Sequence, residues 1–454
     1  MWKSKKPANL EARELLESHF VGRALHELVT ASRVFPATAR VDLQTALERL
    51  LGKESRCRSL KSVGIHCQYG HETVTISHVA STGHYPVLVG PLQYDEVDVG
   101  ETVPARCLKQ ALWLCESEGQ RFALILSPAR KYGQENGVHV EVAVLPGEAG
   151  AELSRGLLGD IEKEVNQAGS YRGKVLSLEA SDNYHGSVGN IRVHRLHPVK
   201  RDQIILPEKT LQLLERNVTR FVQNRNRLAE LQMPVKKGLL FYGPPGTGKT
   251  HTIHYLASEL KDHTTLLITA EQVGLLDTYM QLARFLQPVM VVLEDVDLIA
   301  RQREEMRSGC EESLLNKLLN EMDGLREEAK ILFVLTTNRP EHLEAALTSR
   351  PGRIDQAIEF PLPDDDGRRK LVHLYSRGLQ IPSDVVETVV QKTKGASPAF
   401  IKELMRRSAQ YLIESDRGGG LLEPQHVEAA LDEILFSGGS LNVRLLGGAT
   451  EAGA

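Results

Sequence analysis

Hydrophobic residues in the second half of the chain fall into short, nearly continuous runs. Three such runs cover residues 238–242, 289–293 and 331–335. Runs of this length, each followed by polar residues, are typical of strands that are buried on both faces of a parallel sheet. The first run is followed by apolar residues at helical spacing, at Ile253, Leu256 and Leu260. The pattern predicts an α/β fold with a parallel sheet flanked by helices.

The first 195 residues carry a different mixture of patterns. Residues 10–51 read as helices, whereas residues 72–79 and 137–145 alternate between apolar and polar positions and predict strands. Leu153, Leu157, Leu158, Ile161 and Val165 recur at helical spacing, and residues 173–178 again resemble a strand. We expect a mixed α/β module in this part of the chain.

Helical spacing returns near the end of the chain, at residues 367–378, 383–393, 398–413 and 424–435. These segments predict a small helical lid after the α/β domain. The expected domains are an N-terminal helical segment at 1–55, a mixed α/β domain at 56–195, a large α/β domain at 196–363, the lid at 364–436 and a disordered Gly/Ala-rich tail at 437–454.

A glycine-rich segment directly after the first strand carries the clearest chemistry. It completes the phosphate-binding pattern G-x-x-x-x-G-K-T with Gly243, Pro244, Pro245, Gly246, Thr247, Gly248, Lys249 and Thr250. Glycines let consecutive backbone N–H groups approach a triphosphate, and a lysine in this position reaches the β- and γ-phosphates. The hydroxyl of Thr250 can ligate Mg²⁺ at the start of the following helix, which His251 continues. The segment predicts ATP and Mg²⁺ as ligands.

Polar residues follow the other two strands at the same edge of the predicted sheet. Glu294 and Asp295 end the second strand, where carboxylates can meet Mg²⁺ and the attacking water, and Asn338 ends the third. Arg350 and Arg353 lie on either side of a turn further on and can neutralise charge on a γ-phosphate. Together these residues predict ATP hydrolysis.

This ordered set resembles the AAA subgroup of the AAA+ ATPases over residues 199–435. The resemblance implies a ring, usually a hexamer, with ATP at each subunit junction and with Arg350 and Arg353 acting on the neighbour's nucleotide. It makes Asn338 the sensor of the γ-phosphate. It also implies that Ile205, Leu371 and Tyr375 lie near the adenine.

Two departures from that family's pattern bear on function. The usual Asp-Glu pair is reversed to Glu294-Asp295, so either residue can serve the metal while the other polarises the water. The loop that usually grips polypeptide with an aromatic residue is short here, and Tyr279 is the nearest aromatic. Two hypotheses follow: an ATP-driven ring that remodels, unfolds or disassembles client proteins, and a nucleotide-switched assembly scaffold with slow hydrolysis and no threading.

Composition limits the partners and the compartment. The formal net charge is −4, which gives no indication of nucleic-acid binding. Five cysteines without a C-x-x-C pair suit a reducing cytoplasm, and no run of 18 apolar residues predicts a membrane span. We therefore expect a soluble, cytoplasmic homo-oligomer that binds ATP and, through its N-terminal domain, a protein client or adaptor.

Overall fold

The chain folds into two compact units in a computed structural model that describes residues 10–52, 57–67, 72–82, 85–131, 133–167, 169–180, 188–297, 314–342, 353–415 and 420–437. The first unit comprises Met1–Arg172 and Leu178–Val193, and the second comprises Gly173–Ser177 and His194–Ala454. The expected tail lies almost wholly outside the described residues, which end at residue 437.

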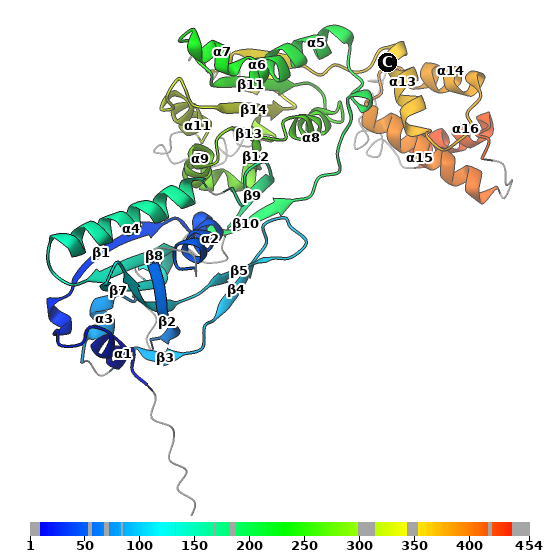
Figure 1. Ribbon diagram of the computed structural model, residues 1–454. Coiled ribbons are helices and arrows are strands. Elements are labelled where there is room, and N and C mark those ends of the chain that lie inside the picture. The colour runs from blue at the N-terminus through cyan, green and yellow to red at the C-terminus, as the bar shows by residue number, and fades with distance from the viewer. Residues whose placement is uncertain are drawn as a thin grey trace, which may run out of the picture. The chain divides into compact units, whose positions relative to one another are not determined.

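A six-stranded sheet with the order β1-β8-β7-β6-β2-β3 forms the centre of the first unit. Its helices α1 and α3 lie on one face and α4 lies on the other (Figure 1). A separate two-stranded ribbon pairs β4 with β5. The elements are α1 (Ala12–His19), η1 (Leu25–Glu27), β1 (Val29–Phe35), η2 (Ala37–Ala39), α2 (Arg40–Leu50), β2 (Cys57–His66), α3 (Ile76–Ala80), β3 (Leu88–Gly90), β4 (Tyr94–Val97), β5 (Ala105–Leu108), β6 (Ala111–Ser117), β7 (Gln120–Lys131), β8 (Gln134–Val144) and α4 (Glu148–Gln167).

The prediction of an all-helical segment before residue 55 was wrong for β1. Val29–Phe35 pairs antiparallel with β8, from Val29 opposite Val144 to Phe35 opposite Val138. The pairing with a distant strand decides the conformation of these residues, and no local periodicity reports it. Since β1 belongs to the same sheet as β8, residues 10–52 are part of the first unit and do not form a separate segment.

The strand predicted at residues 72–79 was also wrong. Ile76–Ala80 is the short helix α3, which Thr75 begins as its N-cap. The Thr75 hydroxyl accepts from the backbone N–H of His78, and the N–H of Thr75 donates to Nδ1 of His78, both at 3.3 Å. This capping box satisfies two backbone donors at the helix start and so stabilises a helix over the alternating pattern. The predicted strand at 137–145 and helix at 153–165 are present as β8 and α4.

The second unit is built around a seven-stranded sheet with the order β10-β9-β12-β13-β14-β11-β15, in which the neighbours from β9 to β15 pair in parallel. The chain passes between the two units within β9 and β10. The elements are β9 (Val175–Ala180), β10 (Val188–His194), η3 (Arg201–Gln203), α5 (Glu208–Asn217), α6 (Thr219–Gln223), α7 (Arg225–Glu230), β11 (Lys237–Tyr242), α8 (Lys249–Glu259), β12 (Thr264–Ile268), η4 (Ala270–Leu275), α9 (Leu276–Phe285), β13 (Val289–Leu293), α11 (Leu314–Asp323), β14 (Ile331–Thr337), η5 (Pro340–His342) and β15 (Gln356–Glu359).

One strand of this sheet comes from before the expected start of the nucleotide-binding domain at residue 196. Val175 and Leu176 of β9 pair in parallel with Thr265 and Leu266 of β12. The domain boundary drawn from the sequence therefore separates β9 from the sheet that it joins. The α/β fold class itself is confirmed.

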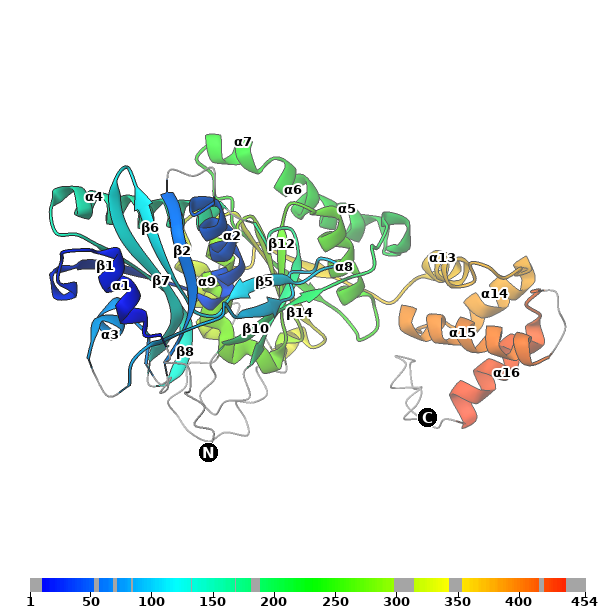
Figure 2. The same ribbon diagram turned by 60° about the horizontal axis from the view of Figure 1, so that its bottom comes forward.

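Helices cover the sheet and a helical lid follows it. On one face, Ile253 and Leu256 of α8 and Leu214 of α5 pack against apolar strand residues such as Phe241 and Val292. The lid has its own apolar core and is formed by α13 (Asp365–Tyr375), α14 (Ser383–Lys392), α15 (Pro398–Glu414), α16 (Pro424–Asp432) and the π-helical turn η6 (Glu433–Ser437). Figure 2 shows these lid helices grouped around α15. Over the described parts of the chain, no helix combines the length and the apolar character needed to cross a membrane.

Candidate nucleotide-binding site

The phosphate loop follows β11 and leads directly into α8. Gly248 is the N-cap of α8 and has a left-handed backbone with φ of 97°, a conformation that glycine adopts at little cost. Gly243 has φ of 146°, and a Cβ at this residue would lie 2.3 Å from the carbonyl oxygen of Phe360. The loop therefore needs glycine for its backbone conformation and for its close approach to the end of β15. Such a loop at a helix N-terminus is an anion-binding site.

Lys249 lies in the loop with its ammonium group directed at oxygen atoms. Its Nζ donates to the carbonyl oxygens of Gly243 at 2.7 Å and Pro244 at 3.0 Å, and to Oδ1 of Asn338 at 2.8 Å. Burial lowers the pKa of Lys249 to about 8, against the opposing effect of the nearby Asp295 and Asp297 carboxylates. A buried cation whose bonded partners are neutral favours an anion in contact with it, and a phosphate meets that requirement.

The two acids after β13 point to different partners. The hydroxyl of Thr250 donates to Oε1 of Glu294 at 2.8 Å, whereas Oδ1 of Asp295 accepts from Nδ2 of Asn338 at 3.0 Å. Asp295 has a positive φ of 51°, an uncommon left-handed conformation that aspartate tolerates better than most residues. This turn brings both neighbouring side chains to the carboxyl edge of the sheet, Glu294 beside the Thr250 hydroxyl and Asp295 beside the Asn338 amide.

A third acid, Asp297, was not predicted as a site residue. Its side chain is buried, and Oδ1 accepts from the Thr337 hydroxyl at 2.9 Å and from the backbone N–H of Asn338 at 3.2 Å. Asp297 thereby fixes the end of β14 from which Asn338 extends. The signal in the sequence was its position two residues after Asp295, in the same acidic run.

These residues surround a cavity of about 590 Å³. Twelve of the predicted residues line it: Ile205, Pro245, Gly246, Thr247, Gly248, Lys249, Thr250, His251, Asp295, Asn338, Leu371 and Tyr375. Gly243 and Pro244 contact Lys249 from the loop itself, and Glu294 contacts Thr250. The α/β domain and the lid both contribute, as the N–H of Ala399 also donates to the carbonyl oxygen of Gly246 at 3.2 Å.

Two cationic residues that line the cavity were missed. Arg377 follows α13, and Lys402 lies one helical turn after Pro398 on α15. The spacing of four residues between Pro398 and Lys402 puts both on one face of α15, and that spacing was available in the sequence.

The structure describes only one of the two predicted arginines, Arg353. Arg350 lies outside the described residues. Nη2 of Arg353 donates to the Asp323 carboxylate of the same chain, and the Arg353 side chain is 11% exposed. Its Nη1 is buried without a hydrogen-bond partner. A trans-acting role for Arg353 requires this side chain to leave Asp323, and that role stays a prediction.

The donor set fits magnesium and a triphosphate. The described residues bring together no group of three or more His, Cys, Asp or Glu side chains suited to holding a metal by themselves. Thr250 and Glu294 instead offer one hydroxyl and one carboxylate, and Mg²⁺ is commonly bound by few protein ligands together with substrate phosphates. These two residues would hold the ion, which would neutralise charge on the phosphates.

Comparison with known proteins agrees with this geometry. Residues 239–362 match the family described as "ATPase family associated with various cellular activities (AAA)". The chain is 32% identical over 239 residues to an ATP-dependent zinc metalloprotease FtsH 3 of Symbiobacterium thermophilum, a match that covers 50% of this chain and 38% of that relative. It is 34% identical over 193 residues to a proteasome-activating nucleotidase of Methanothermobacter thermautotrophicus, covering 40% of this chain and 47% of that relative. The chain thus spans less than half the length of these curated relatives.

The matched segment contains the phosphate loop, Glu294, Asp295 and Asn338. It is an ATPase domain of the AAA type, and the chain is an AAA+ ATPase family member recognised over this segment. ATP and Mg²⁺ are the ligands of such a domain.

Proposed function

We propose that this chain is an ATP-driven remodelling protein that assembles into a homo-oligomeric ring and acts on protein clients selected by its first unit. One arrangement carries the proposal: beside a loop suited to phosphates, Thr250 is hydrogen-bonded to Glu294, and Asn338 is hydrogen-bonded to Asp295. Such a division separates metal binding from activation of the water, as hydrolysis requires. The names of the relatives, an ATP-dependent protease and a proteasome-activating nucleotidase, support a link between ATP and protein substrates.

The alternative is a nucleotide-switched scaffold that does not thread polypeptide, and the segment after β12 favours it. The expected polypeptide-gripping loop is the 3₁₀ turn η4, and Leu275 at its end is buried. Tyr279 is fully buried, and its hydroxyl donates to the carbonyl oxygen of Leu267 at 3.0 Å. The aromatic residue nearest this segment therefore packs in the core and does not extend toward a substrate.

Steady-state ATP turnover with and without a permanently unfolded protein separates the two functions. A remodelling protein should hydrolyse ATP faster when the unfolded protein is present, because engagement of the client couples to turnover. Turnover that is slow and unchanged by unfolded protein, in an assembly shown by sedimentation to be oligomeric, would favour the scaffold. The Lys249→Ala variant is the control for contaminating ATPases.

A further inference from the structure

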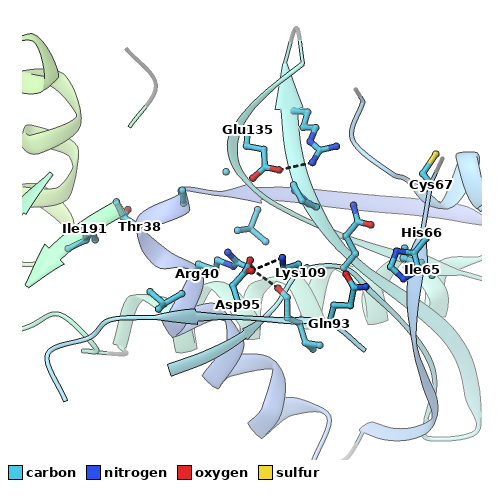
Figure 3. Close-up of a pocket in the computed structure, with 18 of the residues that line it drawn as sticks. Thr38, Arg40, Ile65, His66, Cys67, Gln93, Asp95, Lys109, Glu135 and Ile191 are labelled. Atoms are coloured by element: carbon cyan, nitrogen blue, oxygen red, sulfur yellow. Dashed lines mark hydrogen bonds and ion pairs between the residues drawn. The ribbon is translucent and has the colours of Figure 1, made fainter. Parts of the chain in front are cut away.

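The first unit contains a second cavity, of about 540 Å³, whose lining shares no residue with the nucleotide-binding cavity (Figure 3). Residues from η2, α2, β2, β4, β5, β7, β8 and β10 line it, together with connecting segments, and all of its lining residues belong to the first unit. Cavities of roughly 300–1,000 Å³ hold small ligands or short peptide segments. The site has the size of a binding pocket.

Two cations share one carboxylate at one side of this cavity. Nη2 of Arg40 lies 2.7 Å from Oδ2 of Asp95, and Nζ of Lys109 lies 2.8 Å from Oδ1 of the same side chain. Burial disfavours the charge on Asp95, but the hydrogen bonds from Lys109 and Arg40 hold its pKa below the usual value. Figure 3 shows the three side chains meeting at one point of the wall. Asp95 is therefore ionised, and the cluster of Arg40, Lys109 and Asp95 carries a net charge of one positive.

Arg40 also has donors left for a ligand. Its second hydrogen bond, to the carbonyl oxygen of Leu108 at 3.2 Å, again uses Nη2. The Nε and Nη1 atoms of the same planar guanidinium remain for an oxygen acid. The Arg40 side chain is 28% exposed and that of Lys109 is 48% exposed, so both can be reached from the cavity.

The other two charged residues of the lining, Arg130 and Glu135, neutralise each other, and apolar side chains form the remaining wall. Nη2 of Arg130 pairs with Oε1 of Glu135 at 2.6 Å. With this pair included, the cavity presents three cationic side chains and two carboxylates. Apolar side chains complete the wall, among them Ile65, Val97, Leu108, Val138 and Ile191.

We propose that this cavity binds a monoanionic carboxylate ligand, whose carboxylate contacts Arg40 and Lys109 and whose apolar part packs against Ile65 and Val138. The lining carries one more positive than negative charge, and the single negative charge of a carboxylate balances it. A phosphate dianion would bring a second negative charge into a cavity that already holds Asp95 and Glu135, and like charges repel. A free small acid and the carboxyl terminus of a peptide share this chemistry. The proposal concerns the first unit and stands whether or not the ATPase function holds.

Calorimetry on the full chain tests the proposal with two sets of probes. The first is a series of N-acetylated amino acids, and the second is the matching series of N-acetyl-Gly-Gly-X tripeptides, each as the free acid and as the C-terminal amide. Free acids with an apolar side chain should bind, and their amides should bind at least about tenfold more weakly, a loss of about 1.4 kcal/mol. Tighter binding of the tripeptides would identify a peptide terminus as the ligand, and equal binding would identify a small acid.

Variants separate the cavity from general charge effects. Lys109→Gln should weaken binding of the free acid about tenfold, whereas the control Lys61→Gln, an exposed residue outside the lining, should not. Thr38→Trp should reduce binding by filling the cavity without changing its charge. Basal ATP turnover should be unchanged in all three. The proposal is overturned if no free acid binds at about 1 mM, if the amides bind equally well, if inorganic phosphate binds as tightly as the acids, or if Lys61→Gln weakens binding as much as Lys109→Gln.

Discussion

Lys249 and Asn338 are joined by a hydrogen bond of 2.8 Å from Nζ to Oδ1, although 89 positions separate them in the chain. The bond connects the phosphate loop to the end of β14. The same asparagine donates from Nδ2 to Asp295. Because Asn338 contacts both the lysine of the phosphate loop and the second acid, we propose that it registers whether a γ-phosphate is present.

Removing the ammonium group should prevent nucleotide binding. Lys249→Ala deletes a buried cation and no apolar packing, so we expect ATP affinity to fall by about a hundredfold or more while the fold persists. Calorimetry measures the affinity and circular dichroism checks the fold. Lys209→Ala, an exposed residue on α5, is the matched control and should bind ATP normally. Unchanged affinity in the Lys249→Ala variant would disprove the assignment of the phosphate loop.

Stability of the second unit should fall in acid because of His263. Burial first, then the nearby Arg225, lower the pKa of His263 to about 4, with Lys330 acting in the same direction and Asp262 against it. Nε2 of the neutral ring accepts from Nη1 of Arg225 at 3.2 Å. Because the folded pKa lies below the unfolded value of 6.5, the neutral form contributes stability above pH 6.5, which is lost as the pH falls toward 4. The loss amounts to about 3 kcal/mol.

Urea unfolding at neutral pH and near pH 4 measures this contribution. His263→Gln should show a flatter dependence of the unfolding free energy on pH than the unaltered protein. His373→Gln, at an exposed position on α13, should keep the full dependence. Identical pH profiles for the His263→Gln variant and the unaltered protein would contradict the role of His263.

Mixing inactive subunits tests the ring. An arginine supplied by a neighbour can contribute about 10³–10⁵ in rate, so Arg350→Ala should nearly abolish turnover and leave ATP affinity close to unchanged. Combining Arg350→Ala subunits with Asp295→Asn subunits should restore part of the hydrolysis, because an intact acid pair can then meet an intact arginine. No recovery in preparations shown to co-assemble would contradict shared sites.

Arg353 should behave differently from Arg350. Because Arg353 pairs with Asp323 in its own chain, Arg353→Ala should lower the melting temperature as well as the rate. A variant with normal stability and lost turnover would show instead that Arg353 acts only on nucleotide.

The sequence predicted the chemistry of the site better than its supporting contacts. Gly243, Gly248 and Lys249 could be recognised because a phosphate loop restricts both backbone conformation and residue type. Asp297 lies in the same acidic run as Asp295, but its role depends on Thr337, which comes 40 positions later and meets it only in the folded sheet.

The same limit explains the errors in the fold. Val29–Phe35 is a strand because it pairs with β8, more than a hundred residues away, and β9 pairs in parallel with β12, which comes much later in the chain. A local pattern can indicate a strand, as it does for residues 173–178, but it does not identify the partner of that strand. The lid helices were predictable because their apolar faces repeat within each segment. The cavity around Arg40, Asp95 and Lys109 was not foreseen, since three separate elements bring its charges together.

We infer that the two acids after β13 have different roles, Glu294 in metal binding and Asp295 in activation of the water. ATP binding and turnover measured side by side in Asp295→Asn and Glu294→Gln test it most directly. Asp295→Asn should bind MgATP at nearly normal affinity and fail to hydrolyse it, because the residue beside Asn338 no longer polarises water. Glu294→Gln should weaken binding only when Mg²⁺ is present, because the residue beside Thr250 no longer holds the ion. The opposite pattern would exchange the roles of Glu294 and Asp295. Small, equal losses of binding and turnover in both variants would contradict separate roles for the two acids.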